Sequence, residues 1–359
     1  MAALASSYLT LHAAIDESTT EGLDTQAYPE PGGGGNNGAV AESHVNRYLG
    51  IAAKPHAFSI CGEPDLPVFD KLRLLHGIFT HFVTVPGRTR TNRFHFGNDG
   101  GELVAYGEKM QIDFSVFQRF VATLKALPAG SRVAISGSLP NGMTPEFITD
   151  LLDVLIDWKK AKVLIDADAD IVRAVLDSPY RGRIATIKQN DREFGNLTEP
   201  ISVMDGDRKV FDTGQLIRLT DGLLDGGEYV ITLGKQGIFL RYQDRAWRIM
   251  GTLPGGIKQW TYNRCGDSYV GGNLAAKNAG LDHILRHLGT NYDLVRMGLP
   301  ADFASDPAAP IVLPAMLGVA AATANTSQRQ SGFSLGLLDR IFRDHLSVTE
   351  VTARATVVS

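Results

Sequence analysis

Short apolar runs alternate with helical stretches through the middle of this chain, from residue 113 to residue 233. The runs that have the length and apolar character of buried strands are residues 133–135, 163–165, 184–187 and 229–233. Parallel strands need a crossover connection, which is usually a helix packed on the sheet. The pattern therefore predicts an α/β fold in which helices cover both faces of a parallel sheet.

Polar or glycine residues follow several of the predicted strands directly. In open α/β sheets, ligands bind in a crevice outside the carboxyl ends of the strands. The residues at these positions are Asp16, Ser136, Gly137, Ser138, Asp166, Lys188, Gln189, Asn190 and Gly234. We expect them to line one crevice, with Asp16 brought there by a first strand over residues 8–11.

The segment over residues 87–96 differs in character from the rest of the chain. Its side chains alternate, so that Arg90 and Asn92 share one face of a strand. Residues 98–101, Asn-Asp-Gly-Gly, are a hairpin signal, and residues 102–106 are again strand-like. We expect a small antiparallel excursion from the main body here.

The composition excludes several classes of protein. A formal net charge of -4 argues against a dedicated nucleic-acid surface, and two cysteines, Cys61 and Cys265, cannot form a disulfide framework. The start of the chain lacks the basic segment of a signal peptide, and the longest apolar run, residues 311–324, is too short to cross a bilayer. We expect a cytoplasmic protein that binds neither nucleic acid nor membrane.

Four consecutive glycines occupy residues 32–35. Residues 33–38 satisfy the dinucleotide-binding pattern Gly-x-Gly-x-x-Gly, and Glu63 lies near the position of a ribose-binding acid. However, residues 24–31 do not resemble the buried strand that this motif requires, and glycine runs are often flexible linkers. Both interpretations stay open, and a nicotinamide-dependent oxidoreductase would need a strand immediately before Gly32.

A glycine, a carboxylate and a hydroxyl lead directly into a helix-like segment at Gly266, Asp267 and Ser268. Backbone N–H groups at a helix start and one carboxylate would then face the same point, which suits a phosphate with a base beside it. Asp is also a common helix cap, and caps far outnumber catalytic bases. Taken alone, these residues favour the cap.

Other catalytic motifs are absent from the sequence. Gly234 and Lys235 are followed by Gln236, so there is no Walker A loop, and no Gly-x-Ser-x-Gly elbow occurs. His283 and His287 share a helix face but lack the glutamate and the third ligand of a zinc enzyme. The sequence thus gives no support for a P-loop protein, an α/β hydrolase or a zinc hydrolase.

The order of the motifs along the chain resembles the ribokinase-like family of carbohydrate kinases, specifically its phosphofructokinase-B branch of fructose- and tagatose-phosphate kinases. The likeness runs from about Leu9 to about Ser331. It implies one three-layer α/β/α kinase domain over residues 1–359, with a mostly parallel central sheet. It also implies a small β-sheet lid, formed by inserts at residues 17–31 and 87–112, through which a homodimer could form.

The first four elements of this resemblance concern the sugar. Residues 13–16 look like the family's Asn-Pro-Ala-x-Asp element, residues 32–37 are similar to its glycine-rich sugar loop, and residues 136–140 resemble its Ser-Gly-Ser-Leu-Pro element. Residues 89–92 match a lid strand of the sugar-phosphate branch, where Arg90 stands in the place of a phosphate-contacting arginine. The implied substrate-binding residues are Asp16, Gly33, Gly34, Asn37, Arg90, Asn92 and Ser138.

Two later elements resemble the nucleotide side of the family's site. Residues 188–193 are similar to Lys-Pro-Asn-x-x-Glu, and residues 232–237 are similar to Ser-Leu-Gly-x-x-Gly. The resemblance implies that ATP is contacted by Lys188, Asn190, Thr232, Gly234 and Gly237. It further implies that Asn190 and Glu193 hold Mg²⁺ through water, because this ion keeps most of its hydration shell in proteins.

The last element, residues 264–268, stands where the family has Gly-Ala-Gly-Asp-(Ser/Thr). The resemblance implies that Asp267 takes the proton of the attacking hydroxyl. Backbone N–H groups of Cys265, Gly266 and Asp267 would face the developing negative charge. The implied function is the ATP- and Mg²⁺-dependent phosphorylation of a phosphorylated ketohexose.

Arg264 is the main departure from the family pattern, because it replaces the first glycine of this turn. If the position requires a positive φ, arginine is strained there by roughly 1–3 kcal/mol. A second interpretation is that Arg264 brings a cation to the phosphates, as an arginine finger does. Residues 166–169 and Gln189 also depart from the pattern. These departures leave two further hypotheses, a ligand-binding pseudokinase and a kinase of an unphosphorylated sugar or nucleoside.

Overall fold

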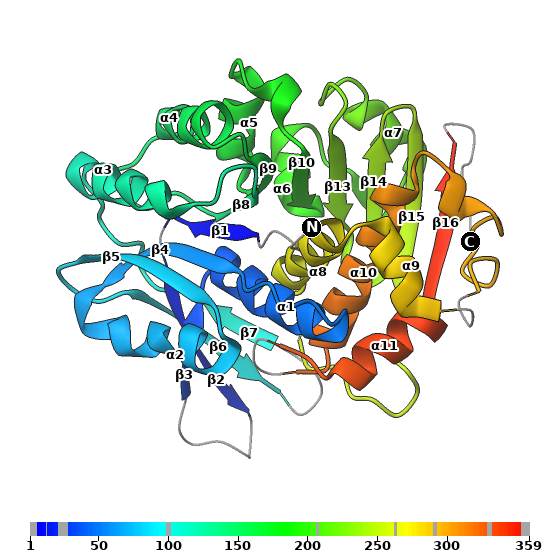
Figure 1. Ribbon diagram of the computed structural model, residues 1–359, viewed down its shortest axis with the longest axis horizontal. Coiled ribbons are helices and arrows are strands. Elements are labelled where there is room, and N and C mark those ends of the chain that lie inside the picture. Colours follow the sequence, from blue (N-terminus) through cyan, green and yellow to red (C-terminus); the bar gives the residue numbers. More distant parts are fainter. Residues whose placement is uncertain are drawn as a thin grey trace.

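The computed structural model describes residues 6–11, 13–20, 28–97, 102–205, 208–261, 264–289, 293–328 and 332–352. A ten-stranded sheet runs through the middle of the molecule (Figure 1). In spatial order its strands are β16 (Leu346–Val351), β15 (Arg245–Gly251), β14 (Ile238–Tyr242), β13 (Glu228–Thr232), β10 (Thr186–Asn190), β9 (Lys162–Ala167), β8 (Arg132–Gly137), β1 (Ser7–Thr10), β4 (His56–Gly62) and β5 (Phe79–Val85). The strands from β5 to β13 are parallel, whereas β14, β15 and β16 are antiparallel. The predicted mostly parallel sheet is confirmed.

Helices cover both faces of this sheet (Figure 1). One face carries α1 (Gly34–Tyr48), α2 (Leu66–His76), α8 (Cys265–Ala279), α9 (Leu281–Leu288), α10 (Ala309–Asn325) and α11 (Leu335–Asp344). The other carries α3 (Phe114–Thr123), α4 (Glu146–Leu152), α5 (Ala169–Asp177), α6 (Asp191–Leu197) and α7 (Thr213–Thr220). Short helical turns are η1 (Glu63–Asp65), η2 (Leu124–Ala126), η3 (Asp153–Trp158), η4 (Arg181–Arg183), η5 (Gly234–Gln236) and η7 (Phe303–Ser305).

The two helical layers explain why the central strands are apolar along their whole length. Successive side chains of a strand point to opposite faces of the sheet. In β1, Tyr8 packs with the layer that contains α1 and α8, and Leu9 packs with the opposite layer. Because both faces are buried, short continuous apolar runs replace the alternation of a half-exposed strand. The three-layer α/β/α architecture is thus confirmed.

A second sheet forms a small lid. Its strands in spatial order are β3 (Tyr28–Gly32), β2 (Ala14–Thr20), β6 (Arg90–Phe96) and β7 (Glu102–Ala105). Two details differ from the sequence prediction. Asp16 lies inside β2 and does not directly follow the first strand of the central sheet, and β2 pairs with β6 in parallel, so the lid is not wholly antiparallel. The expected turn at residues 98–101 lies outside the described residues.

A strand does precede the consecutive glycines, which the sequence did not predict. This strand, β3, ends at Gly32 and pairs antiparallel with β2 in the lid. The dinucleotide motif needs a strand of the central parallel sheet at this position, so the context for a nicotinamide-binding loop is missing. A flexible linker is also wrong here, because Gly34 and Gly35 form the first turn of α1.

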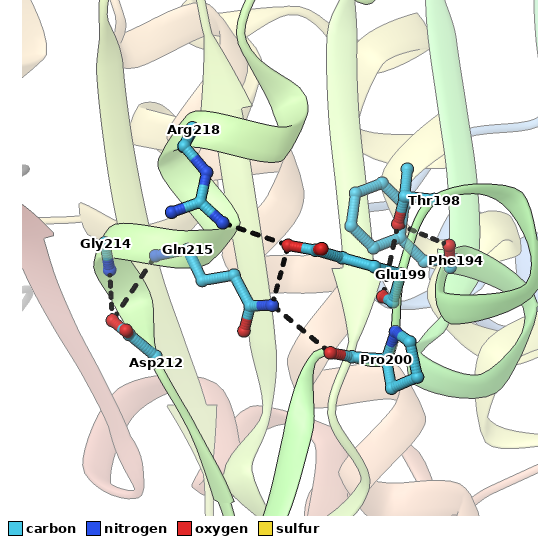
Figure 2. Close-up of polar contacts among 8 residues, drawn as sticks. All are labelled: Phe194, Thr198, Glu199, Pro200, Asp212, Gly214, Gln215 and Arg218. Carbon is cyan, nitrogen blue, oxygen red and sulfur yellow. Dashed lines mark hydrogen bonds and ion pairs between the residues drawn. The ribbon is translucent and has the colours of Figure 1, made fainter.

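A small hairpin of β11 (Ser202–Asp205) and β12 (Arg208–Phe211) is anchored to the body at its base. Figure 2 shows that the Glu199 carboxylate accepts hydrogen bonds from Arg218 Nη2 at 2.9 Å and from Gln215 Nε2 at 3.1 Å. Asp212, at the end of the hairpin, caps α7 by accepting from the backbone N–H of Gln215. The hairpin carries Lys209 on β12, which pairs with Asp191 and reaches the cavity described below.

Within the described residues, none of the helices has the length and apolar character needed to span a bilayer.

Candidate active site

A cavity of about 1180 Å³ lies where the carboxyl ends of β8, β9, β10 and β13 meet the lid. All the site residues that the family resemblance implied line it. On the lid and glycine-loop side these residues are Asp16, Gly33, Gly34, Asn37, Arg90, Asn92 and Ser138. On the opposite side they are Lys188, Asn190, Glu193, Thr232, Gly234, Gly237, Arg264, Cys265, Gly266 and Asp267. The expected single crevice therefore exists, and its size exceeds that of a typical pocket for one small ligand.

Of the residues expected in this cavity from the strand ends, Ser136 and Gln189 do not line it and are buried. Gln189 points to the opposite face of β10 from Lys188, where its Oε1 accepts a hydrogen bond from the Tyr229 hydroxyl.

The turn into α8 has the conformation that a glycine would adopt most easily. Arg264 is the N-cap residue of this helix, with φ 63° and ψ -1°, in the left-handed region. The helix itself starts at Cys265, and the residues of its first turn, Cys265, Gly266 and Asp267, line this end of the cavity. At Gly266 a Cβ atom would come within 2.5 Å of Lys188 Nζ. A larger residue here would therefore displace the ammonium group of the lysine.

Asp267 is not the helix cap that the isolated motif favoured. The cap position belongs to Arg264, and Asp267 accepts a hydrogen bond at Oδ2 from Asn37 Nδ2, at 3.0 Å, across the cavity wall. Its Oδ1 atom lies so close to Gly34 that a Cβ atom there would be 3.1 Å away. The carboxylate is therefore held by α1 and α8 together.

The surroundings of Asp267 favour its neutral form. Burial raises the pKa of Asp267 to about 7, and the negative charge of Asp166 adds to this effect. The ammonium of Lys188 and the hydrogen bond from Asn37 oppose it. A carboxyl group with a pKa near neutrality is suited to accept a proton and to release it again.

Lys188 and Asp166 form a buried ion pair on neighbouring parallel strands, β10 and β9. The two residues are register partners, and Lys188 Nζ lies 2.7 Å from Asp166 Oδ1, with 6% and 8% of the side chains exposed. Burial alone would lower the pKa of Lys188, but the carboxylates of Asp166, Glu193 and Asp267 together outweigh it and the pKa is raised. The lysine is therefore a fixed positive charge beside Gly266.

The lid contributes one face of polar side chains to the cavity. Asn92 Nδ2 donates to Asp16 Oδ1 at 3.0 Å, since the two residues are opposite each other in β6 and β2. Arg90 lies on the same face of β6, with its guanidinium carbon 5.9 Å from the centre of the Tyr106 ring. Burial lowers the pKa of Arg90 from its usual value. A half-buried cation next to a carboxylate and an amide could hold an anionic group and a hydroxyl together.

Arg264 turns its side chain toward this lid. Its Nε atom lies 3.2 Å from Asp16 Oδ2, and its Nη1 atom lies 3.9 Å from Glu30 Oε2. The guanidinium carbon is 4.9 Å from the centre of the Phe94 ring. These contacts are with lid residues, and they differ from the phosphate contact that an arginine finger would make.

Asn190 and Glu193 bond to each other at the start of α6. Asn190 Oδ1 accepts from the backbone N–H of Glu193 at 2.8 Å, and Glu193 Oε2 accepts from that of Asn190 at 2.7 Å. This capping box could have been found from the Asn-x-x-Glu spacing in the sequence. In the described part of the chain, no cluster of three His, Cys, Asp or Glu side chains could hold a metal ion. The oxygen atoms of Asn190 and Glu193 are of the donor type that Mg²⁺ and its bound water take in proteins.

Phe94, Tyr106 and Lys109 are among the cavity-lining residues that the sequence analysis did not nominate. Phe94 could have been found, because it continues the alternation of Arg90 and Asn92 along β6. Tyr106 and Lys109 follow the last lid strand in an irregular segment, where no periodicity marks the direction of a side chain.

Comparisons with known proteins give likenesses in sequence and in fold. The sequence is 25% identical over 307 residues to the ATP-dependent 6-phosphofructokinase isozyme 2 of Escherichia coli (strain K12). The aligned region covers 77% of this chain and 88% of that protein. No family model matches the chain.

Among solved structures, Escherichia coli phosphofructokinase-2 in complex with substrates and products is similar with a TM-score of 0.70 and 19% identity, over 94% of this chain and 98% of that one. A possible 1-phosphofructokinase from Thermotoga maritima is similar with a TM-score of 0.70 and 19% identity, over 97% and 99% of the two chains. Both kinds of likeness extend over most of the chain.

Proposed function

We propose that this chain is a ribokinase-like carbohydrate kinase of the phosphofructokinase-B type. It transfers the γ-phosphoryl group of ATP to a hydroxyl of a phosphorylated ketohexose, a fructose or tagatose phosphate. The observation that carries this proposal is that Asp267 and Arg90, far apart in sequence, line one cavity. A base for the hydroxyl and a cation for a phosphate already on the acceptor are the two groups that such a substrate needs.

Phosphoryl transfer depends mainly on positioning and on neutralising the charge of the moving group. Asp267 accepts the proton of the acceptor hydroxyl, and Asn37 holds its carboxylate in place. The backbone N–H groups at the start of α8 and the ammonium of Lys188 face the transferred group. Because these donors are fixed before the reaction, they need no reorganisation when the negative charge develops.

The two substrates are held at opposite ends of the cavity in this proposal. Arg90 binds the acceptor's phosphate, and Asp16 and Asn92 lie next to its hydroxyls. Nucleotide contacts come from Lys188, Asn190, Thr232, Gly234 and Gly237. Mg²⁺, when bound, neutralises charge on the nucleotide phosphates. Asn190 and Glu193 would hold its water molecules, and this role remains a prediction from the family resemblance.

The rate should depend on pH through Asp267. A base works in its deprotonated form, so activity should be lost as the pH falls through the pKa of about 7. We expect kcat/KM for fructose 6-phosphate to fall about tenfold for each pH unit below that value, and to level off above it. The measurement is ADP formation at saturating MgATP between about pH 5.5 and pH 8.5, with stability checked at each pH. A flat profile would remove Asp267 from the role of base.

Arg90 should distinguish phosphorylated from unphosphorylated acceptors. Replacing it with alanine removes charged hydrogen bonds to the phosphate, so we expect KM for fructose 6-phosphate to rise about 10- to 100-fold. The weaker use of fructose should change little. Arg93→Ala is the matched control, because Arg93 lies on the same strand and points away from the cavity, with 74% of its side chain exposed.

An equal loss for fructose and fructose 6-phosphate in the Arg90→Ala variant would contradict the phosphate contact. It would favour the alternative of a kinase for an unphosphorylated sugar or nucleoside.

A second candidate function is a ligand-binding pseudokinase of the same fold. The observation that favours it is the ion pair between Arg264 and Asp16, which engages a carboxylate expected to hold sugar hydroxyls. A pseudokinase would be stabilised by sugar phosphate without forming ADP.

The oligomeric state of this chain is also a prediction. The Escherichia coli relative has a tetrameric inhibited form, and we propose a homodimer through the lid for this chain, in the cytoplasm.

A further inference from the structure

Arg264, in the turn that leads into α8, contacts three strands of the lid. Its partners are Asp16 on β2, Glu30 on β3 and Phe94 on β6. The arginine side chain is 7% exposed, although it lines the cavity. In this low exposure Arg264 differs from the other non-glycine residues that have a left-handed backbone conformation. The other non-glycine residues with positive φ in the described chain, Lys160 and Gln243, are exposed.

The arginine limits the capacity of the Asp16 carboxylate to accept hydrogen bonds from a ligand. Asp16 is buried, and each of its carboxylate oxygens already faces a protein donor. Oδ1 accepts from Asn92 at 3.0 Å, and Oδ2 lies 3.2 Å from Arg264 Nε. A pair of sugar hydroxyls that bound this carboxylate would have to compete with a guanidinium. Such an exchange gains little, because the hydroxyls would bond to the carboxylate only by displacing the cation that is paired with it.

We infer that Arg264 is a specificity-determining residue. Its guanidinium occupies the side of the Asp16 carboxylate that faces the acceptor. It therefore selects against acceptors that would bind this carboxylate through a pair of hydroxyls. Acceptor binding then depends chiefly on the phosphate contact of Arg90, which lies two residues before Asn92 on the same lid face. The substrate class is narrowed to sugars that carry a phosphate. This inference rests on the proposed function for the identity of the acceptor, but its test does not require turnover.

The backbone supports a role for this side chain. Glycine would occupy φ 63° with less strain, so arginine is kept at this turn against a local preference of the chain. A strained residue that the surroundings hold in place is an observation from which a functional role can be argued. The ion pair with Asp16 supplies that role here, because at 3.2 Å it is closer than the contact with Glu30 at 3.9 Å.

The test is calorimetric binding of fructose 6-phosphate, without nucleotide, to the full chain and to Arg264→Gly. Removing the guanidinium leaves Asp16 able to accept the sugar hydroxyls, so we expect Kd to fall about tenfold. Adding Asp16→Asn to the variant should abolish that gain, because the hydroxyls then lose their charged acceptor. Lys160→Gly is the matched control, because it relieves the strain of a left-handed backbone conformation at an exposed site. It should leave Kd unchanged.

Arg264→Asn is a second variant, in case the glycine variant does not fold. Asparagine tolerates the left-handed region and carries no charge, so the same gain is expected. Unchanged, weaker or undetectable binding in both variants would overturn the inference. Tighter binding by the variants with no ADP formation by any protein would uphold it and would reject the proposed kinase function. Turnover by the native chain with unchanged Kd in the variants would reject the inference alone.

Discussion

Replacing Asp267 with asparagine is expected to lower kcat about 10²- to 10⁴-fold, the contribution usually made by a positioned general base. Asparagine keeps the shape of the side chain but cannot take a proton. The contact with Asn37 and the start of α8 should persist, so KM for fructose 6-phosphate should change much less than kcat. Steady-state ADP formation with MgATP and fructose 6-phosphate measures both constants.

The same substitution should raise stability above neutral pH, which separates loss of a base from loss of the fold. In the native chain the pKa of Asp267 is raised to about 7, so stability is lost as the pH rises through that value. The neutral asparagine has no such loss. We expect a higher Tm than native at about pH 8, and a difference that shrinks as the pH falls below 7. Asp170→Asn, at an exposed position of α5, is the control and should change neither activity nor Tm.

Replacing Lys188 with methionine is expected to reduce both stability and activity strongly. It leaves the buried Asp166 carboxylate without its cation, and breaking such a pair costs about 3–5 kcal/mol. It also removes a positive charge beside the anion-binding turn, so kcat should fall about 10²- to 10³-fold, as it does when one preorganised donor is lost. Urea unfolding and ADP formation measure the two effects.

The chain offers a matched control for this variant. Lys277 and Glu228 form another buried pair with an N–O distance of 2.7 Å and side chains that are each 6% exposed. Lys277 does not line the cavity. Lys277→Met should therefore lose comparable stability and keep kcat, measured at a temperature where the variant is folded. Equal losses of kcat in the two lysine variants would mean that Lys188 acts only on the fold.

The central fold could be predicted because its signals are local. Each buried strand of the parallel part is a short apolar run, and the helices between them carry apolar residues at helical spacing. The lid strands β2 and β3 could not be predicted in the same way. Their sequences are polar or contain prolines, and their pairing is set by contacts with distant segments. Asp16, for example, lies opposite Asn92.

The site was predicted largely through the order of its motifs, and its geometry was not. From the sequence we could predict that Arg264 replaces a glycine and that it is strained if its φ is positive. The direction of its side chain could not be predicted. Its partner Asp16 is far away in the chain, and an ion pair between such positions has no local signal. The raised pKa of Asp267 likewise depends on burial and on Asp166, which only the folded chain brings together.

The most direct test of the account is phosphorus NMR of the purified native chain with MgATP and, in separate samples, fructose 6-phosphate, fructose 1-phosphate and tagatose 6-phosphate. The account predicts a sugar bisphosphate and ADP in equal amounts with at least one of these acceptors, and almost none with Asp267→Asn. No bisphosphate from any of them, although the sugar phosphates raise the Tm of the native chain, would contradict the kinase assignment and would establish a binding protein of the same fold.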